Sequence, residues 1–377
     1  MINLASLNLH NFLRKWALDA TVPELNMPIG VVSAEEYFQE MDYRKLGWRS
    51  LRRKIFFLLS GQSKYKINTL KNIEKRGLWF YFGEHQIGDA LMDLAPRSLL
   101  KENGYQLDLI TEDTIAYLFV GDPWFDNIYS VDTFRKLKSY DFAIVLNNKR
   151  RSIKLKRHIF KTLPWISIQE NFSGPDFDRA GYATQRICDL LNIRLTPENF
   201  VNHAKQKLNP RLISNKFDDD RTKFSSTVGL CIGGVDPLRT YKGWSPLISK
   251  LIRTGHHKFV LIGSENGRKD AELLQREFKD TEIYNFVGCC TIHESHYLLS
   301  KVKVVVCADG GLMHLSATTN TPMIALMASS IKPEWRLSLN PTTVCIQSTT
   351  KDVNDISAIH IFTALYNLFA KLDWGII

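Results

Sequence analysis

The stretch Cys307–Ala317, which reads Cys-Ala-Asp-Gly-Gly-Leu-Met-His-Leu-Ser-Ala, decides the fold of this chain. It completes an apolar run that starts at Val302 and is interrupted only by Lys303, a pattern typical of a buried strand. The run ends in Asp309 and two glycines, and an apolar helical pattern begins at once. Glycines let a phosphate approach the backbone, and the start of a helix supplies unpaired N–H groups and positive dipole charge. The pattern predicts a nucleotide site, although an ordinary strand-turn-helix also fits it.

Alternating strand and helix patterns extend on both sides of this stretch. Such alternation predicts parallel strands joined by crossover helices, an α/β architecture. A polar segment, residues 215–225, divides the alternation and is interpreted as a linker. Asp218–Asp220 within it matches the D-x-D of metal-dependent sugar transferases, but a charged linker is the better interpretation of those acids. The expected strands are Leu78–Phe82, Gln106–Thr111, Asn127–Val131, Phe142–Leu146, Trp165–Ile168, Thr227–Ile232, Phe259–Ile262, Ile283–Phe286, Val302–Ala308, Met323–Met327 and Val344–Ile346.

Three motifs in order resemble one family. The segment that starts at Asp309 resembles the D-T-G-L-x-H-L-x-A signature of the ADP-heptose:lipopolysaccharide heptosyltransferases, glycosyltransferase family 9. Gln86–Pro96 resembles the family's N-terminal L-G-D element, and Gly233-Gly234 with Tyr241–Pro246 resembles its donor-phosphate segment. The similarity covers residues 76 to 350, whereas the first 75 residues match nothing recognisable.

The resemblance implies a GT-B fold, in which two doubly wound Rossmann-like domains face each other across a cleft. The expected parts of the chain are a basic helical N-terminal extension (1–75), an acceptor domain (76–214), the linker (215–225), a nucleotide-sugar donor domain (226–355) and a C-terminal helix that packs back across the domains (356–377).

The resemblance also implies an inverting transfer of heptose from ADP-heptose to a hydroxyl of the lipopolysaccharide inner core. Asp89 is then the general base, although an Asp before a helix at Ala90 is equally typical of a cap. Asp309 is expected on the ribose and Glu265 near the ribose or base. Lys242 is the main candidate cation for the diphosphate. The donor-binding candidates are Gly233, Gly234, Arg239, Lys242, Glu265, Asp309, Gly310, Gly311 and Leu312.

Three departures from the family pattern leave the donor open. Gly310 replaces the usual Thr, Leu326–Ser330 replaces F-G-P-T, and Gly83–Ile87 lacks the usual basic residue. A glycosyltransferase of the same fold that uses a UDP- or GDP-sugar on another glycan or protein is therefore an alternative. A sugar-nucleotide epimerase would need further acids that we cannot identify. The non-enzyme alternatives are a degenerate nucleotide-sugar-binding protein and a membrane adaptor, against which Asp89 and Lys242 together argue.

The net charge of +10 over 377 residues is concentrated in two clusters. An anionic membrane surface or a phosphorylated lipid-linked or oligosaccharide acceptor explains them, and a solvated helix face is the plain alternative. No recognised motif supports nucleic acid as a partner. Lys149, Arg150 and Arg151 are the acceptor-binding candidates. The clusters are Arg44, Lys45, Arg49, Arg52, Arg53 and Lys54, and Lys149, Arg150, Arg151, Lys154, Lys156, Arg157 and Lys161.

The six cysteines show no C-x-x-C spacing, and neither they nor the histidines form a metal-ligand pattern, so no metal cofactor is expected. The start of the chain lacks a signal-peptide pattern, and no apolar run approaches the roughly 20 residues that span a bilayer. A cytoplasmic protein, peripheral on the inner membrane at most, is therefore expected.

Overall fold

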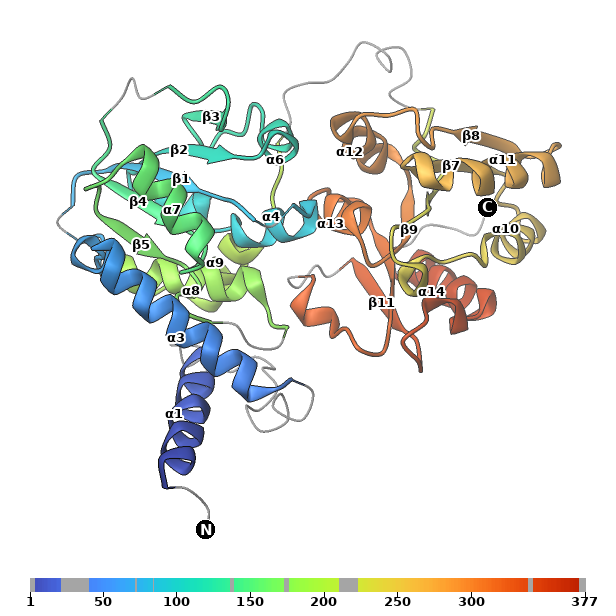
Figure 1. The fold of residues 1–377 in the computed structure, drawn as a ribbon. Coiled ribbons are helices and arrows are strands. Elements are labelled where there is room, and N and C mark those ends of the chain that lie inside the picture. The colour runs from blue at the N-terminus through green and yellow to red at the C-terminus, as the bar shows by residue number, and fades with distance from the viewer. Residues whose placement is uncertain are drawn as a thin grey trace. The chain divides into compact units, whose positions relative to one another are not determined.

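The computed structural model describes residues 4–21, 41–71, 73–83, 85–135, 139–172, 176–209, 223–337 and 342–372. They form two compact units (Figure 1). The first unit comprises Met1–His85 with Met92–Lys205, and the second comprises Gln86–Leu91 with Gln206–Ile377. Asp218–Asp220, most of the expected linker and residues 373–377 lie outside the described residues.

The first unit is built on a five-stranded parallel sheet of order β3-β2-β1-β4-β5. Because β1 pairs with both β2 and β4, the chain reverses its direction of travel across the sheet at β1. The strands are β1 (Arg76–Phe80), β2 (Gln106–Thr111), β3 (Asn127–Ser130), β4 (Phe142–Val145) and β5 (Trp165–Ser167), and the helices are α4 (Ile87–Asp93, whose first residues group with the second unit), α5 (Arg97–Glu102), α6 (Asp113–Leu118), α7 (Arg150–Ile159), α8 (Arg179–Leu191) and α9 (Pro197–Ala204).

The second unit is built on a six-stranded parallel sheet of order β11-β10-β9-β6-β7-β8, which reverses at β6 and β9. Its strands are β6 (Val228–Ile232), β7 (Lys258–Gly263), β8 (Glu282–Asn285), β9 (Val304–Ala308), β10 (Met323–Met327) and β11 (Thr343–Gln347). Its helices are α10 (Trp244–Arg253), α11 (Arg268–Glu277), α12 (Ile292–Lys301), α13 (Gly311–Ala317) and α14 (Ala358–Lys371), with short 3-10 turns η3 (Pro237–Arg239), η4 (Glu265–Gly267), η5 (Pro333–Trp335) and η6 (Val353–Asp355).

Each expected strand is present, and all the strand pairs are parallel, so the predicted α/β class with two doubly wound sheets is confirmed. Strands buried on both faces read as continuous apolar runs, and this made them visible in the sequence. One expected helix is wrong. The pattern from Ala90 to Leu100 forms two helices, α4 and α5, because Pro96 has no N–H and its ring disfavours a continuous helix.

The expected C-terminal helix is present as α14. Ile361, Leu365, Leu368 and Phe369 bury its apolar side in the core of the second unit. Ser357 caps its start by accepting a hydrogen bond from the His360 N–H. This helix therefore contributes directly to the core beneath the second sheet.

The predicted helical N-terminal extension is also confirmed, as a hairpin of α1 (Leu4–Thr21) and α3 (Tyr43–Ser60) on the first unit (Figure 1). Gly47 lets the two helices approach closely, since a Cβ there would lie 2.4 Å from the Leu13 carbonyl oxygen. The Phe57 ring stacks on Trp165 of β5 at 5.6 Å and fixes α3 to the core. Among the described residues, no helix is long and apolar enough to cross a membrane.

Candidate functional site

The reversal point of the second sheet brings the predicted donor motifs together. Gly233-Gly234 follows β6 and Asp309 follows β9, and these two strands are neighbours. In open parallel sheets, ligands bind at such a reversal point, outside the carboxyl ends of the strands. Gly233 adopts a φ of 91°, and a Cβ on it would lie 2.9 Å from the Gly267 Cα. Only glycine permits this tight turn beside β7.

The Asp309 carboxylate is buried among cationic side chains. Its Oδ2 accepts a hydrogen bond from Arg239 Nη1 at 3.2 Å, and its Oδ1 lies 3.8 Å from Arg336 Nε and 3.9 Å from His314 Nε2. Arg239 Nε also donates to Asp236 at 3.0 Å. Burial alone lowers the pKa of Arg239, but the Asp309 and Asp236 carboxylates outweigh it and raise that pKa above its ordinary value. Asp309 is thus a buried acceptor held in place by Arg239.

Two of these partners were not assigned to the site from the sequence. Arg336 lies just after η5, where no motif signals it, and its carbonyl accepts a hydrogen bond from Gln206 Nε2 at 2.6 Å. His314 lies in the signature segment but is not among the predicted donor-binding residues; its Nδ1 bonds to Gln206 Oε1 at 3.0 Å and its Nε2 lies 3.9 Å from Asp309. Gln206 therefore bonds to the His314 ring and to the backbone of Arg336, two of the three residues around the carboxylate, and nothing local in the sequence reveals this long-range pairing.

The two glycines after Asp309 have space beside them. A Cβ on Gly311 would meet nothing within 4 Å, and one on Gly310 would meet only the Ala308 carbonyl oxygen at 3.9 Å. Packing therefore does not explain these glycines. They stand at the start of α13, where the first N–H groups have no partner within the helix. Open space in front of such N–H groups suits a phosphate.

Gly88, before Asp89, shows the opposite situation. A Cβ on it would lie 2.3 Å from the His314 ring, so His314 excludes any side chain there. Asp89 is the third residue of α4 and is half-buried. Because α4 begins at Ile87 rather than at Ala90, Asp89 does not occupy the cap position, and the capping interpretation is wrong.

Asp93, one turn further along α4, is unavailable for acid–base chemistry. It is fully buried and pairs with Arg179, whose Nε donates to Oδ1 at 3.0 Å. The Tyr81 hydroxyl and Gln169 amide also donate to it. This network makes Asp93 part of the framework of the first unit.

The two predicted donor cations lie in different surroundings. Arg239, in η3, contacts Asp309, whereas the Lys242 side chain is exposed on the loop before α10. Asn354 holds that loop: it accepts from the Lys242 N–H at 2.8 Å and donates to the Thr240 carbonyl at 3.1 Å. Hydrogen bonds from Asn354 lower the pKa of Asp352, and the charge of Lys242 adds to that effect. The structure thus brings Arg239, but not Lys242, to Asp309.

Glu265 lies at the same edge of the sheet, directly after β7. Its carboxylate forms a two-point ion pair with Arg268, at 2.6 Å and 2.5 Å, and this pair lowers the pKa of Glu265. The side chain remains largely exposed. It is therefore an ionised acceptor open to solvent beside the Gly233 turn.

The predicted acceptor cations lie at the reversal point of the first sheet. Lys149, Arg150 and Arg151 follow β4 and are exposed at the start of α7. Asn147 Oδ1 accepts from the Lys149 N–H at 3.1 Å and fixes this turn. Arg151 Nη2 lies 3.4 Å from Glu112, which follows β2. This edge is cationic and open.

Behind these cations lies a buried ionic cluster that no sequence pattern indicated. Glu170, after β5, adopts a φ of 48°, which is uncommon for a residue with a side chain. Its carboxylate pairs with Lys66 and with Arg186 at 2.6 Å, and Asn148 donates to it at 3.3 Å. Lys156, a member of the second basic cluster, is also fully buried and donates to Gln62 at 3.0 Å. That cluster is therefore not uniformly a solvated helix face.

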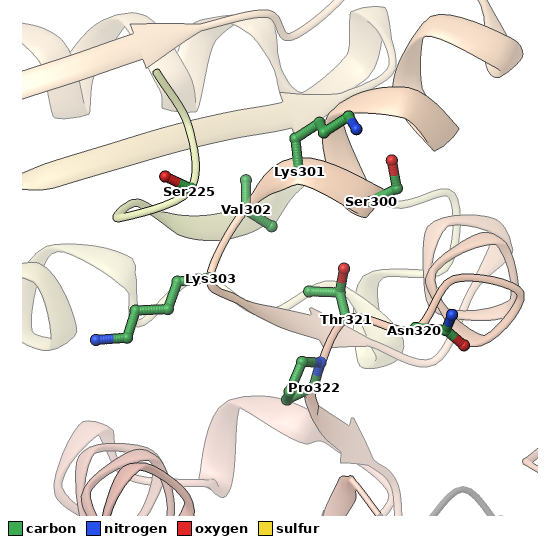
Figure 2. A pocket seen from close by; sticks show the side chains of 8 residues that line it. All are labelled: Ser225, Ser300, Lys301, Val302, Lys303, Asn320, Thr321 and Pro322. Carbon is green, nitrogen blue, oxygen red and sulfur yellow. The ribbon is translucent and has the colours of Figure 1, made fainter. Parts of the chain in front are cut away.

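An open depression of about 420 Å³ lies at the other edge of the second sheet (Figure 2). Its lining residues include Val302, Lys303 and Pro322, which precede β9 and β10. The edge that carries Asp309 is at the carboxyl ends of the same strands, so this depression is not part of the candidate site. In the described ranges, no group of three or more His, Cys, Asp or Glu side chains is placed to hold a metal ion.

Comparison with known proteins identifies the class of enzyme. The model of glycosyltransferase family 9 (heptosyltransferase) matches residues 192–363, which contain most of the second unit. This match confirms the resemblance that the motifs indicated and identifies the chain as a glycosyltransferase. Among curated proteins, no sequence matches the chain significantly.

Solved structures share the fold. ADP-heptose lipopolysaccharide heptosyltransferase II of E. coli is 18% identical, with a TM-score of 0.57 over 78% of this chain and 99% of that one. A family 9 glycosyltransferase of Veillonella parvula is 14% identical, with a TM-score of 0.63 over 81% and 100%. E. coli heptosyltransferase WaaC with ADP is 14% identical, with a TM-score of 0.59 over 78% and 99%. These likenesses confirm the GT-B type of fold.

Proposed function

We propose that this glycosyltransferase transfers a heptose from ADP-heptose, with inversion, to a hydroxyl of a lipopolysaccharide inner-core acceptor at the cytoplasmic face of the inner membrane. The observation that carries the proposal is the turn Asp309-Gly310-Gly311 at the reversal point of the second sheet. An anchored carboxylate, cations and unfilled space beside two glycines meet there. Relatives of the same fold are described with ADP and as ADP-heptose enzymes, which supports this donor.

The donor side of the proposal assigns each group a role from its chemistry. The N–H groups that follow Gly310 bind the diphosphate, and Asp309 accepts from sugar hydroxyls while Arg239 holds its carboxylate in place. Lys242 stands on a loop held by Asn354 and supplies a mobile ammonium for the leaving phosphate oxygen. Glu265 accepts hydrogen bonds from the ribose or base.

On the acceptor side, Asp89 takes the proton of the attacking hydroxyl. Gly88 packs on His314, which itself faces Asp309, so the Asp89 turn lies next to the Asp309 turn within the second unit. A half-buried carboxylate in the first turn of α4 can take a proton from a hydroxyl that comes within hydrogen-bond reach. The exposed Lys149, Arg150 and Arg151 attract the negative charge of an inner-core acceptor.

The experiment is thermal melting of the full chain with ADP, UDP, GDP and CMP and their sugars. A ligand that binds only the folded chain adds about 2.7 kcal/mol of stability at 100 times its dissociation constant. We expect ADP and ADP-heptose to raise the melting temperature and the others to leave it unchanged. Selective stabilisation by UDP or GDP would support a glycosyl transfer from a different donor and would contradict ADP-heptose as the donor. If no nucleotide stabilises the chain, the donor site is wrongly assigned.

A further inference from the structure

Helix α3, which packs on the first unit, carries positive charges only. Between Tyr43 and Ser60 it has no acidic residue. Its cations lie between Arg44 and Lys54, and an apolar run from Ile55 to Leu59 follows them. The cations are Arg44, Lys45, Arg49, Arg52, Arg53 and Lys54.

One side of α3 is fixed to the first unit. Phe56 and Phe57 pack against the core cluster that contains Trp165, and Arg53 Nη1 donates to the Asn171 carbonyl at 3.0 Å. A second side faces α1, where Lys54 pairs with Asp19 at 3.3 Å. The helix is thus held rigidly on two sides.

The remaining side of α3 exposes large apolar residues. Leu58 and Leu59 are 79% and 80% exposed, and Trp48 and Ile55 are 45% and 46% exposed. Trp48, Arg52, Ile55 and Leu59 follow the i, i+4, i+7, i+11 spacing that places side chains on one helix face. The exposed face is therefore an apolar stripe that contains one cation, Arg52.

The plain alternative is a solvated basic face. That interpretation accounts for the arginines but not for two adjacent leucines that are four-fifths exposed on a helix otherwise packed at Phe56 and Phe57. A contiguous apolar patch with a polar rim marks an interaction site. Arg and Lys flanking Trp and Leu on one helix face favour the interface of an anionic bilayer, where the apolar side chains enter and the cations meet phosphates.

Neighbouring elements extend the same surface. On α1, Leu9 and Phe12 are 48% and 55% exposed, and Arg14 and Lys15 beside them are exposed as well. On α7, the Arg150 guanidinium lies 5.6 Å from the Phe56 ring centroid, which joins the second basic cluster to α3. The absence of acids along α3 also argues against a basic protein partner.

We propose that the α1–α3 hairpin docks this protein on an anionic lipid bilayer. Leu58, Leu59, Ile55 and Trp48 enter the interface, and the surrounding cations bind lipid phosphates. The docking surface is built entirely within the first unit and is independent of the sugar transferred. It would hold the protein at the surface where a lipid-linked acceptor lies.

The test is cosedimentation of the full chain with phosphatidylcholine vesicles, with and without phosphatidylglycerol. We expect binding only when phosphatidylglycerol is present, and weaker binding at high salt. Leu58→Ser/Leu59→Ser should lower the partition coefficient at least about tenfold, and Lys45→Gln/Arg52→Gln should weaken both the binding to anionic vesicles and its salt dependence. All four side chains are exposed, so the melting temperatures should not change.

The matched controls lie on α11 of the second unit. Leu273→Ser removes a leucine that is 59% exposed, and Arg276→Gln removes an exposed cation; neither should alter vesicle binding. The proposal is overturned if the chain binds both vesicle types equally, if it binds neither, or if Leu58→Ser/Leu59→Ser binds like the wild type. Gel filtration that shows self-association abolished by the leucine variant, without vesicle binding, would instead assign the face to a second copy of the chain.

Discussion

The two sheets have the same kind of topology but present different chemistry at their carboxyl edges. At the reversal point of the second sheet, Asp309 is buried beside Arg239 and is followed by two glycines with open space. At the reversal point of the first sheet, Lys149, Arg150 and Arg151 are exposed, and the turn at Gly83, which has a φ of 87°, follows Tyr81 and Phe82 rather than an acid. Topology thus determines where a ligand can bind, and the side chains at that edge determine which ligand it is.

Donor binding and acceptor binding should therefore respond to different substitutions. A turn with glycines and an anchored acid suits a nucleotide diphosphate, whereas a set of exposed cations suits an anionic acceptor. Substitutions at the second edge should change donor binding, and those at the first edge should change the KM for the acceptor. Asp89 should change neither binding event, because its proposed role is in the chemical step.

The largest expected effect is that of Asp89→Ala. Removing a general base lowers kcat by roughly 10²- to 10⁴-fold, and the dissociation constant of ADP should stay nearly unchanged. Steady-state kinetics and calorimetry measure the two quantities. Asp113→Ala is the control, because Asp113 is an exposed acid in the first turn of another helix, α6. Normal turnover with weakened ADP binding would contradict the role of Asp89 as base.

The next effect is that of Gly311→Ala. A Cβ at Gly311 meets no protein atom within 4 Å, so the melting temperature without ligand should not fall. The methyl group should occupy the phosphate position and weaken ADP binding by at least about tenfold, since a lost charge-assisted hydrogen bond contributes 1.5–3 kcal/mol. Calorimetric titration with ADP measures this.

Gly88→Ala is the matched comparison for that glycine. Its Cβ would lie 2.3 Å from His314, so this variant should lower the melting temperature through overpacking, by about 1–3 kcal/mol of stability. If Gly311→Ala destabilises the chain as much as Gly88→Ala does, Gly311 is required for the fold, and its role as a phosphate site is contradicted.

A smaller effect is expected at the first edge. Lys149→Gln/Arg151→Gln should raise the KM for an anionic acceptor by roughly 5- to 20-fold, with ADP affinity unchanged and the difference shrinking at high salt. Arg157→Gln, an exposed cation near the other end of α7, is the control. A loss of ADP affinity in the double variant would erase the distinction between the two edges.

A last effect lies outside both edges and concerns stability and pH. Burial lowers the pKa of Lys156 from its ordinary value of 10.5 to about 8. Between these values the unfolded chain binds more protons than the native chain, so stability rises with pH, by at most about 1.4 kcal/mol per unit. Denaturant unfolding from pH 7.5 to 10.5 should show this rise in the wild type and in Lys161→Met, but not in Lys156→Met. An unchanged slope in Lys156→Met would show that another group titrates.

The sequence predicts the sheets well because their strands are buried on both faces, so that runs such as Val304–Ala308 stand out as continuous apolar segments. It also predicts which turns lie at one edge, because the carboxyl ends of parallel strands share that edge. It does not predict that Arg336 and His314 meet Asp309, or that Lys66 and Arg186 meet Glu170. The pairs made by Arg336, Lys66 and Arg186 join residues at least 16 positions apart, and the orientation of His314 depends on the distant Gln206, so no local pattern records these contacts.

The measurement that tests the central claim most directly is mass spectrometry of an inner-core acceptor incubated with ADP-heptose and the full chain. We predict a product heavier by one heptose unit, release of ADP, and neither with Asp89→Ala. Transfer from a UDP- or GDP-sugar with none from ADP-heptose, or no transfer from any donor by a chain that binds ADP, would contradict the account.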